Sequence, residues 1–121
     1  MIDHIGLTVN DLDKSKAFYI QAFEPLGMGL VMEVEGWSAF GPPNQPIFWL
    51  SEQDLHQRPM HICFRAANRA QVDAFYEAAL AAGGQDNGKP GIREHYHPNY
   101  YGAFVIDPDG HNIEAVCHDP E

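Results

Sequence analysis

The sequence predicts an α+β protein in which one module, a strand followed by a helix and three strands, occurs twice. Two observations support this prediction. Residues 3–27 and 60–84 align without a gap at an offset of 57 (61 − 4), and seven positions are identical, including His4 with His61. The hydrophobic pattern also gives the same order of elements in each half. An internal repeat that carries its secondary structure with it indicates duplicated structural units.

The first module begins with alternating residues at 2–9, where Ile5, Leu7 and Val9 share one face, as in a half-buried strand. Asn10 and Asp11 can cap a helix over 12–24, which Pro25-Leu26-Gly27 would end. Three short strands are then predicted at 27–36, 37–41 and 46–50. Gly36, Gly41 and the turn formers at 42–44 separate them.

The second module repeats this order. Residues 60–66 alternate, Asn68 and Gln71 resemble a capping box, and the helix is expected to end near Ala82. A strand is predicted at 93–97, the REHYH segment, within a stretch rich in turn formers. Residues 101–118 read as a β-hairpin closed by the turn at 107–110, Asp-Pro-Asp-Gly.

Length and charge restrict the possible functions. The 121 residues form one domain, 1–121, with modules at 1–52 and 59–121 and a polar linker over 51–59 that contains His56. A net charge of −10 argues against a nucleic-acid or anionic-membrane partner. No apolar run in the sequence reaches membrane-spanning length, and no signal peptide is expected in its first residues. Cys63 and Cys117 form no CxxC pair, so a reduced, cytoplasmic setting is expected.

Three polar strand residues point to metal chemistry. His4 and His61 lie on the faces of the two opening strands that do not carry the apolar residues, and Glu114 interrupts the apolar last strand. A single strand histidine is usually solvated, but two of these residues are related by the repeat. Two imidazoles and a carboxylate leave open positions on one divalent metal per site, either Fe, Mn, Zn, Ni or Co.

The segments HIGLTVNDLDKSKAFY, HICFRA and FVIDPDGHNIEAV resemble the vicinal oxygen chelate superfamily, which includes glyoxalase I, extradiol dioxygenases and bleomycin-resistance proteins. The resemblance spans nearly the whole chain. It implies a curved eight-stranded mixed sheet built from two βαβββ modules, often in a homodimer. It also implies that His4, His61 and Glu114 bind a divalent metal on which the oxygens of a small-molecule substrate chelate. Whether the site lies within one chain or across a dimer interface stays open.

Two departures from the family pattern bear on the reaction. Aligning 42–50 with 108–116 at an offset of 66 (108 − 42) places Phe48 opposite Glu114, where glyoxalase I has a fourth ligand. Extradiol dioxygenases have a tyrosine before the turn, whereas this chain has Phe104. Phe48 and Phe104 are therefore expected to line the substrate pocket, and Phe48 to form an apolar wall.

Other polar residues near the hairpin are candidates for substrate contact. Arg93 could hold an anionic group, His97 could act as a general acid or base, and Tyr100 could line the pocket. Cys63 shares the face of His61 and is expected to be a small buried residue. The remaining histidines of the hairpin, His111 and His118, are expected to be solvated.

The predicted function is that of a divalent-metal-dependent enzyme acting on a small oxygenated metabolite. It would be either a lyase or isomerase similar to lactoylglutathione lyase, or a dioxygenase, and Glu114 would serve as ligand and catalytic group. The alternative is a non-catalytic binding protein of the bleomycin-resistance type, which sequesters a small molecule in a dimer. A third possibility is a fold whose metal is structural or absent.

Overall fold

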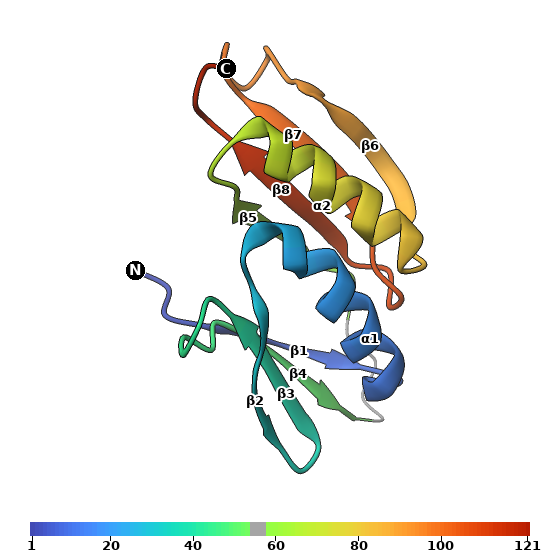
Figure 1. The fold of residues 1–121 in the computed structure, drawn as a ribbon. Coiled ribbons are helices and arrows are strands. Elements are labelled where there is room, and N and C mark those ends of the chain that lie inside the picture. The colour runs from blue at the N-terminus through green and yellow to red at the C-terminus, as the bar shows by residue number, and fades with distance from the viewer. Residues whose placement is uncertain (54–57) are drawn as a thin grey trace.

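The computed structural model describes residues 1–53 and 58–121 and confirms an α+β fold of two βαβββ modules (Figure 1). Part of the predicted linker, residues 54–57 with His56, lies outside the described residues. The first module contains β1 (Ile5–Val9), α1 (Leu12–Phe23), a short 3-10 turn (Glu24–Leu26), β2 (Gly29–Val34), β3 (Trp37–Gly41) and β4 (Phe48–Glu52). The second contains β5 (His61–Arg65), α2 (Arg69–Ala81), β6 (Gln85–Ile92), β7 (Tyr101–Ile106) and β8 (Asn112–Cys117).

Each module forms its own four-stranded mixed sheet. The strand orders are β1-β4-β3-β2 and β5-β8-β7-β6, and among the described strands only the β1–β4 and β5–β8 pairs are parallel. β1 and β5 are therefore edge strands. Helix α1 packs on the first sheet, α2 packs on the second, and the helices contact each other (Figure 1). Among the described residues, no helix is long and apolar enough to cross a membrane.

An aromatic cluster between the helices and the sheets forms the core. Phe48 of β4 is fully buried, with its ring centroid 4.9 Å from that of Tyr19 and 5.5 Å from that of Phe23. Phe64 of β5 joins the same cluster, 4.8 Å from Phe23 and 5.6 Å from Phe48. Because Phe64 comes from the second module, burial of this shared apolar surface holds the two modules together.

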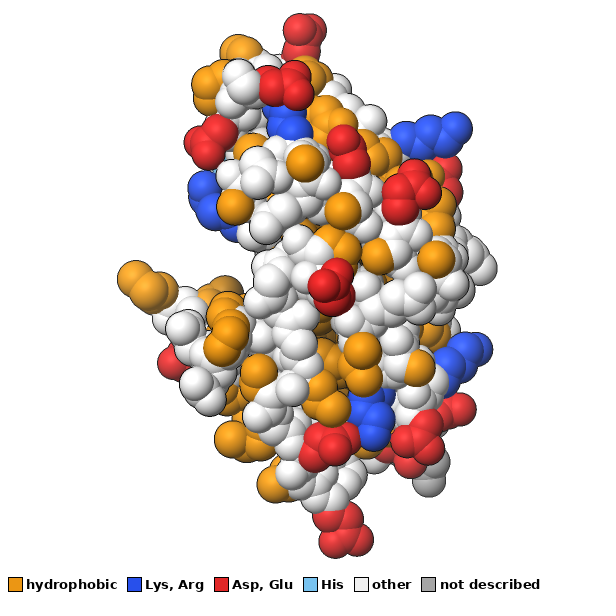
Figure 2. Space-filling view, viewed as in Figure 1, with side chains coloured by type: hydrophobic (Ala, Val, Ile, Leu, Met, Phe, Trp, Pro, Cys, Tyr) orange, Lys and Arg blue, Asp and Glu red, His pale blue; other side chains and the backbone are white. Residues whose placement is uncertain are grey.

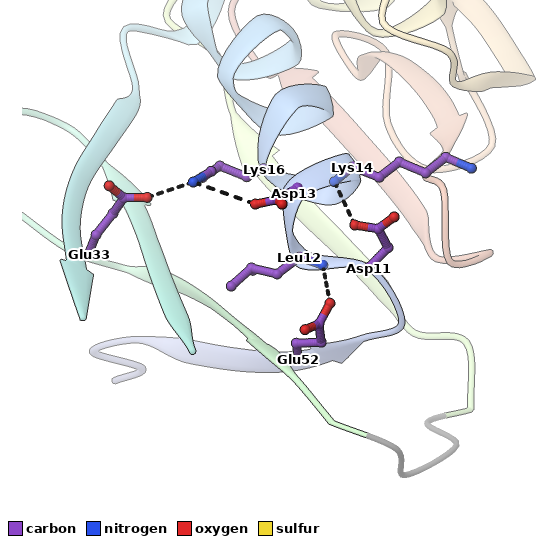
Figure 3. A network of polar contacts seen from close by, with 7 residues as sticks. All are labelled: Asp11, Leu12, Asp13, Lys14, Lys16, Glu33 and Glu52. Carbon is purple, nitrogen blue, oxygen red and sulfur yellow. Dashed lines mark hydrogen bonds and ion pairs between the residues drawn. The ribbon is translucent and has the colours of Figure 1, made fainter. Parts of the chain in front are cut away.

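The helix starts agree with the predicted caps. Asp11 accepts a hydrogen bond from the backbone N–H of Lys14 (3.1 Å), and Asn68 accepts one from Gln71 (2.9 Å). The Gln71 side chain in turn accepts from the backbone N–H of Ala67 (2.8 Å), so two N–H groups at the start of α2 are satisfied. Figure 3 shows the Asp11 cap beside a bond that ties the start of α1 to Glu52 at the end of β4.

The predicted strand at 93–97 is wrong. β6 instead covers Gln85–Ile92, and residues 93–100 form turns closed by the bonds Tyr96 N to Arg93 O (3.0 Å) and Tyr100 N to His97 O (3.1 Å). β6 lacks the alternating pattern expected of a strand because it is an edge strand that contains Pro90 and register shifts around Gly88. Its pairing with β7 outweighs its weak local pattern.

The turn between β7 and β8 docks on the first module. Asp107 accepts bonds from the backbone N–H groups of Asp109 (2.9 Å) and His111 (2.8 Å), which close the turn. Its other oxygen accepts from the buried hydroxyl of Tyr19 on α1 (2.5 Å). Asp109 accepts from the hydroxyl of Ser15, also on α1 (3.0 Å). Burial and the charge of Asp107 raise the pKa of Tyr19 well above its usual value.

His111 is a structural residue of this turn, and the expectation that it is solvated is wrong. The residue is 1% exposed, and its Nδ1 accepts a bond from the backbone N–H of Met60 (3.0 Å). His111 therefore joins the turn to the residue that precedes β5. Its sequence position within a turn gave no sign of this burial.

Candidate metal centre

His61 and Glu114, two residues of the predicted triad, lie together on the face of the second sheet opposite α2. β5 and β8 pair in parallel with Cys63 opposite Glu114, so His61 and Glu114 are diagonal neighbours on one face. His61 Nε2 lies 2.9 Å from Glu114 Oε1. The His61 side chain is 52% exposed and that of Glu114 is 2% exposed, so the pair is open to solvent on the histidine side.

Tyr100 holds the other oxygen of the carboxylate. Its hydroxyl donates a hydrogen bond to Glu114 Oε2. Loss of hydration and this bond to Glu114 raise the pKa of Tyr100, so the phenol stays protonated and remains a donor at neutral pH. Tyr100 thus supplies a hydroxyl at the carboxylate although Phe104, not a tyrosine, stands before the turn. Orienting partners of this kind fix a ligand for its metal.

Gly102 makes room for this contact and was missed in the sequence. A Cβ at Gly102 would lie 3.2 Å from Glu114 Oε2 and 3.2 Å from Tyr100 Cε1, which is tighter than an ordinary contact. The available signal was a glycine inside an apolar strand, which often marks a close approach of another group.

Cys63 faces the same carboxylate, and the expectation that it is buried is wrong because the residue is exposed. Loss of hydration at the thiol, followed by the negative charge of Glu114, raises the pKa of Cys63 to about 12. The thiol is therefore protonated at neutral pH, which makes it a poor nucleophile.

His4 lies apart from this pair. It is exposed, just before β1, with its Nδ1 2.6 Å from Asp3 Oδ1. It borders a hollow of about 460 Å³ on the first sheet, which is lined also by Gly6, Val34, Trp37 and Trp49. Across the described residues, no three His, Cys, Asp or Glu side chains are grouped to hold a metal ion. The donors of one chain thus fit a metal only in part, as an imidazole and a carboxylate with open positions.

The strand register corrects the predicted counterpart of Glu114. Ile5 pairs with Phe48 in the first sheet, and its repeat counterpart Ile62 pairs with Ile113 in the second. Phe48 therefore corresponds to Ile113, and Trp49 corresponds to Glu114, at an offset of 65 (114 − 49). The sequence allowed both offsets because Pro42 and Pro43 are adjacent. The offset of 66 matches Pro42 with the turn proline, whereas the observed offset of 65 matches Pro43 with it.

The register also removes Phe48 from the predicted pocket. Phe48 points into the core beneath α1 and is 0% exposed, so it forms no wall of the site. Trp49 occupies the other face of β4, on the side of the hollow beside His4. The position that the resemblance gives to a fourth ligand does carry an apolar side chain, but that side chain is Trp49.

Phe104 borders the His61–Glu114 pair, and Arg93 lies on the ring of Phe104. Phe104 lies opposite Glu114 in the β7–β8 register, and its ring centroid is 6.1 Å from that of His61. The Arg93 guanidinium lies over the Phe104 ring (5.4 Å) and donates to the carbonyl oxygens of Gly91 (2.8 Å) and Lys89 (2.7 Å). Both terminal nitrogens of Arg93 thus bind the backbone of β6.

His97 does not contact Glu114. Its Nε2 lies 2.7 Å from Nδ1 of His118, which is half-buried rather than solvated as expected. Both rings pack against Tyr100, so His97 reaches the candidate centre only through that residue.

A paired-module fold with a histidine and a carboxylate on neighbouring strands defines a known class. The chain belongs to the Glyoxalase/Bleomycin resistance protein/Dioxygenase superfamily, whose family profile matches residues 1–115.

Individual proteins and solved structures are also similar to this chain. The metallothiol transferase FosB of Shouchella clausii is 30% identical over 120 residues, which cover 94% of this chain and 77% of the relative. A crystal structure of a glyoxalase/bleomycin resistance protein from Albidiferax ferrireducens is 29% identical with a TM-score of 0.82, over 97% of this chain and 98% of that one. A putative glyoxalase from Bacillus halodurans has the same fold, with 23% identity, a TM-score of 0.71 and coverage of 97% and 95%.

Proposed function

We propose that the protein is a divalent-metal-dependent enzyme that transfers a thiol to a small oxygenated substrate and acts as a homodimer. The observation that carries the proposal is the His61 Nε2–Glu114 Oε1 pair at 2.9 Å, with Glu114 buried and held by Tyr100. A nitrogen and an oxygen that face each other across a shared proton suit a cation that replaces the proton. The relative named a metallothiol transferase supports the choice of reaction.

In this proposal a second copy supplies His4. β1 and β5 are both edge strands, with backbone groups on one side that no strand in the described chain pairs with. They lie on either side of a hollow of about 370 Å³ that His4, Cys63 and Arg65 help to line, and Figure 2 shows an indentation between the modules. Two copies related by a two-fold axis would place β1 of each beside β5 of the other. His4 of one copy would then complete the His61–Glu114 pair of its partner.

In the proposed reaction, the metal, Glu114 and Tyr100 would have separate roles. A bound divalent cation would act as a Lewis acid on a substrate oxygen. Glu114 would bind through one oxygen while Tyr100 keeps the other oriented. In thiol transfer a carbon–sulfur bond forms, a carbon–oxygen bond breaks, and the released oxygen takes up the proton of the thiol. That thiol would come from a second small molecule, because Cys63 is protonated at neutral pH and Cys117 is buried.

The apolar hollow favours a substrate with a hydrophobic part. Trp37 and Trp49 pack edge to face with centroids 6.3 Å apart, and Trp37 is 39% exposed. The missing side chain of Gly6 leaves space beside Trp49. In the proposed dimer this surface adjoins the metal and would contact the part of the substrate that does not chelate.

A second candidate, a binding protein that sequesters a small molecule, is favoured by the same hollow. The lyase or isomerase related to lactoylglutathione lyase is less favoured because Trp49 stands where a fourth ligand would be needed. For a dioxygenase, Tyr100 offers a hydroxyl at Glu114 but from a different position. Turnover separates these functions from sequestration.

Metal content and complementation test the centre. Protein purified without chelator should contain close to one divalent ion per chain, and His4→Ala, His61→Ala and Glu114→Gln should each lose it. His4→Ala and His61→Ala chains refolded together at equal amounts should regain about a quarter of the wild-type metal, because half of the dimers carry one intact site. No recovery in the mixture would exclude a site shared between copies.

Turnover tests the reaction. Metal-loaded wild-type protein should consume a small thiol in the presence of an electrophilic epoxide or activated ester. Titration of the remaining thiol measures this consumption. Glu114→Gln should show only the background rate. Tight binding of the electrophile without thiol loss would favour sequestration, and hemithioacetal isomerisation or O₂ uptake with a catechol would favour the other enzyme classes.

A further inference from the structure

His97 and His118 form an imidazole pair behind Tyr100. His97 lies in the turn before β7 and His118 directly follows β8. Their rings are nearly parallel (24°) with centroids 5.0 Å apart, and His97 Nε2 lies 2.7 Å from His118 Nδ1. This contact joins two segments that are 21 residues apart in sequence.

A second hydrogen bond fixes the protons on both rings. The backbone N–H of Asn99 donates to His97 Nδ1 (3.0 Å), so this nitrogen accepts and carries no proton. A neutral His97 must then carry its proton on Nε2 and donate it to His118 Nδ1. His118 in turn must carry its proton on Nε2, because a neutral imidazole has one donor and one acceptor.

This arrangement holds only while both rings are neutral. A second proton on His97 would sit on Nδ1, against the N–H of Asn99. A second proton on His118 would sit on Nδ1, against the Nε2–H of His97. In either case two N–H groups would face each other in place of a donor and an acceptor, so the contact would be lost.

The two imidazole rings pack against Tyr100, whose hydroxyl bonds to Glu114. The ring centroid of Tyr100 is 5.4 Å from those of both His97 and His118, at interplanar angles of 73° and 86°. The Tyr100 backbone also donates to the His97 carbonyl oxygen (3.1 Å). The other titratable groups around this assembly are Glu114 and Cys63 at the Tyr100 hydroxyl, Tyr96 beside its ring, and the sequence neighbours Glu94, His95 and Asp119.

We propose that His97 and His118 are positioning residues that hold Tyr100 on Glu114 only while both imidazoles are neutral. Protonation of either ring separates the pair and frees the turn that carries Tyr100. Histidine changes charge between about pH 5 and 8, so the orientation of Glu114 becomes pH-dependent through residues that do not touch it. The inference rests on the proposed function only where Glu114 is taken as a metal ligand.

Nuclear magnetic resonance on metal-free protein labelled in the histidine rings (¹⁵N) and at tyrosine Cζ (¹³C) tests this directly. At pH 8, His97 and His118 should both be protonated on Nε2 alone. On acidification to pH 5, the Tyr100 Cζ signal should shift in step with the ring nitrogens of the pair. An Nδ1–H form of His97 at pH 8, or a Tyr100 signal that does not follow the pair, would overturn the inference.

Variants separate positioning from general stability. His118→Leu removes the acceptor and should shift the Tyr100 signal at pH 8 to its acid position. His118→Asn places an amide oxygen near the former Nδ1 and should restore the wild-type signal at pH 8. His95→Gln, an exposed change in the same turn, should leave the signal unchanged. Because these experiments use metal-free protein, a negative result would overturn this inference without bearing on whether the protein binds a metal.

Discussion

The two modules share a scaffold but differ on one face. On the side that carries the helices, the two modules keep the same core residues; Phe18 and its counterpart Phe75, for example, are both fully buried. On the opposite face the register matches Trp37 with Gly102 and Trp49 with Glu114. The first module thus has two indole rings at the positions where the second has a carboxylate and a glycine.

This difference shows how a duplicated unit acquires two roles. Removing the side chain at Gly102 lets Tyr100 reach Glu114, whereas Trp37 and Trp49 build an apolar surface beside His4. Neither change disturbs the core, because successive residues of a strand face opposite sides of the sheet. In the proposed centre, the second sheet would provide the ligand pair, and the first would provide the hydrophobic wall and one more imidazole.

The largest expected effect concerns the bond between Tyr19 and Asp107, which links the two modules. Tyr19 donates to Asp107 of the other module, whereas its counterpart Tyr76 interacts with Asp86 of its own module. Asp107→Ala leaves the buried Tyr19 hydroxyl and two turn N–H groups without their acceptor, which should cost about 3 kcal/mol of unfolding free energy. Urea denaturation measures this cost.

The matched control for this prediction is Asp86→Ala. It removes the partner of Tyr76 and should destabilise the protein less, because Asp86 is exposed. Equal losses in the two variants would show that the link between the modules contributes no more than a contact within one module.

The next largest effect separates the two faces in metal binding. Glu114→Gln should weaken divalent metal binding at least about 100-fold because it removes a charged ligand, and Tyr100→Phe by about 10- to 100-fold because it removes an orienting partner. Trp49→Phe, at the matched position of the first module, should leave affinity within a few-fold. Titration calorimetry with Zn(II) or Mn(II) checks the order, and equal effects at positions 49 and 114 would contradict it.

The sequence was sufficient for the repeat, the helices and the placement of His61 beside Glu114. It was insufficient wherever a distant partner decides the outcome. β6 forms a strand because it pairs with β7, and buried His111 bonds to the distant Met60. Two adjacent prolines left the register of Trp49 ambiguous by one residue. The distance between His4 and the other candidates depends on how the modules pack, which local patterns do not encode.

A smaller effect is expected from filling the space at Gly102. Gly102→Ala places a methyl group 3.2 Å from Glu114 Oε2 and from Tyr100 Cε1, so one of them must shift. Metal affinity should fall by roughly fivefold, in line with displacement of an orienting group. Trp37→Gly, the reverse change at the matched position of the first module, should leave affinity unchanged. An unaltered affinity in Gly102→Ala would mean that Tyr100 adapts without cost.

The last prediction concerns thiol reactivity and compares Cys63 with its counterpart Gly6. The pKa of Cys63 is raised to about 12, so the folded state keeps this proton at pH values where the unfolded thiol loses it. The stability gained from the neutral thiol is present below the unfolded pKa, near 8.5, and is lost as pH rises toward 12.

Alkylation of Cys63 by iodoacetamide at pH 8 should accordingly be at least about tenfold slower than that of a free cysteine. Glu114→Gln should speed the reaction, because it removes the negative charge that opposes the thiolate. A Gly6→Cys variant, facing Trp49 in place of a carboxylate, should react faster than Cys63. If both thiols reacted at the same rate, the carboxylate would not be what distinguishes the two faces.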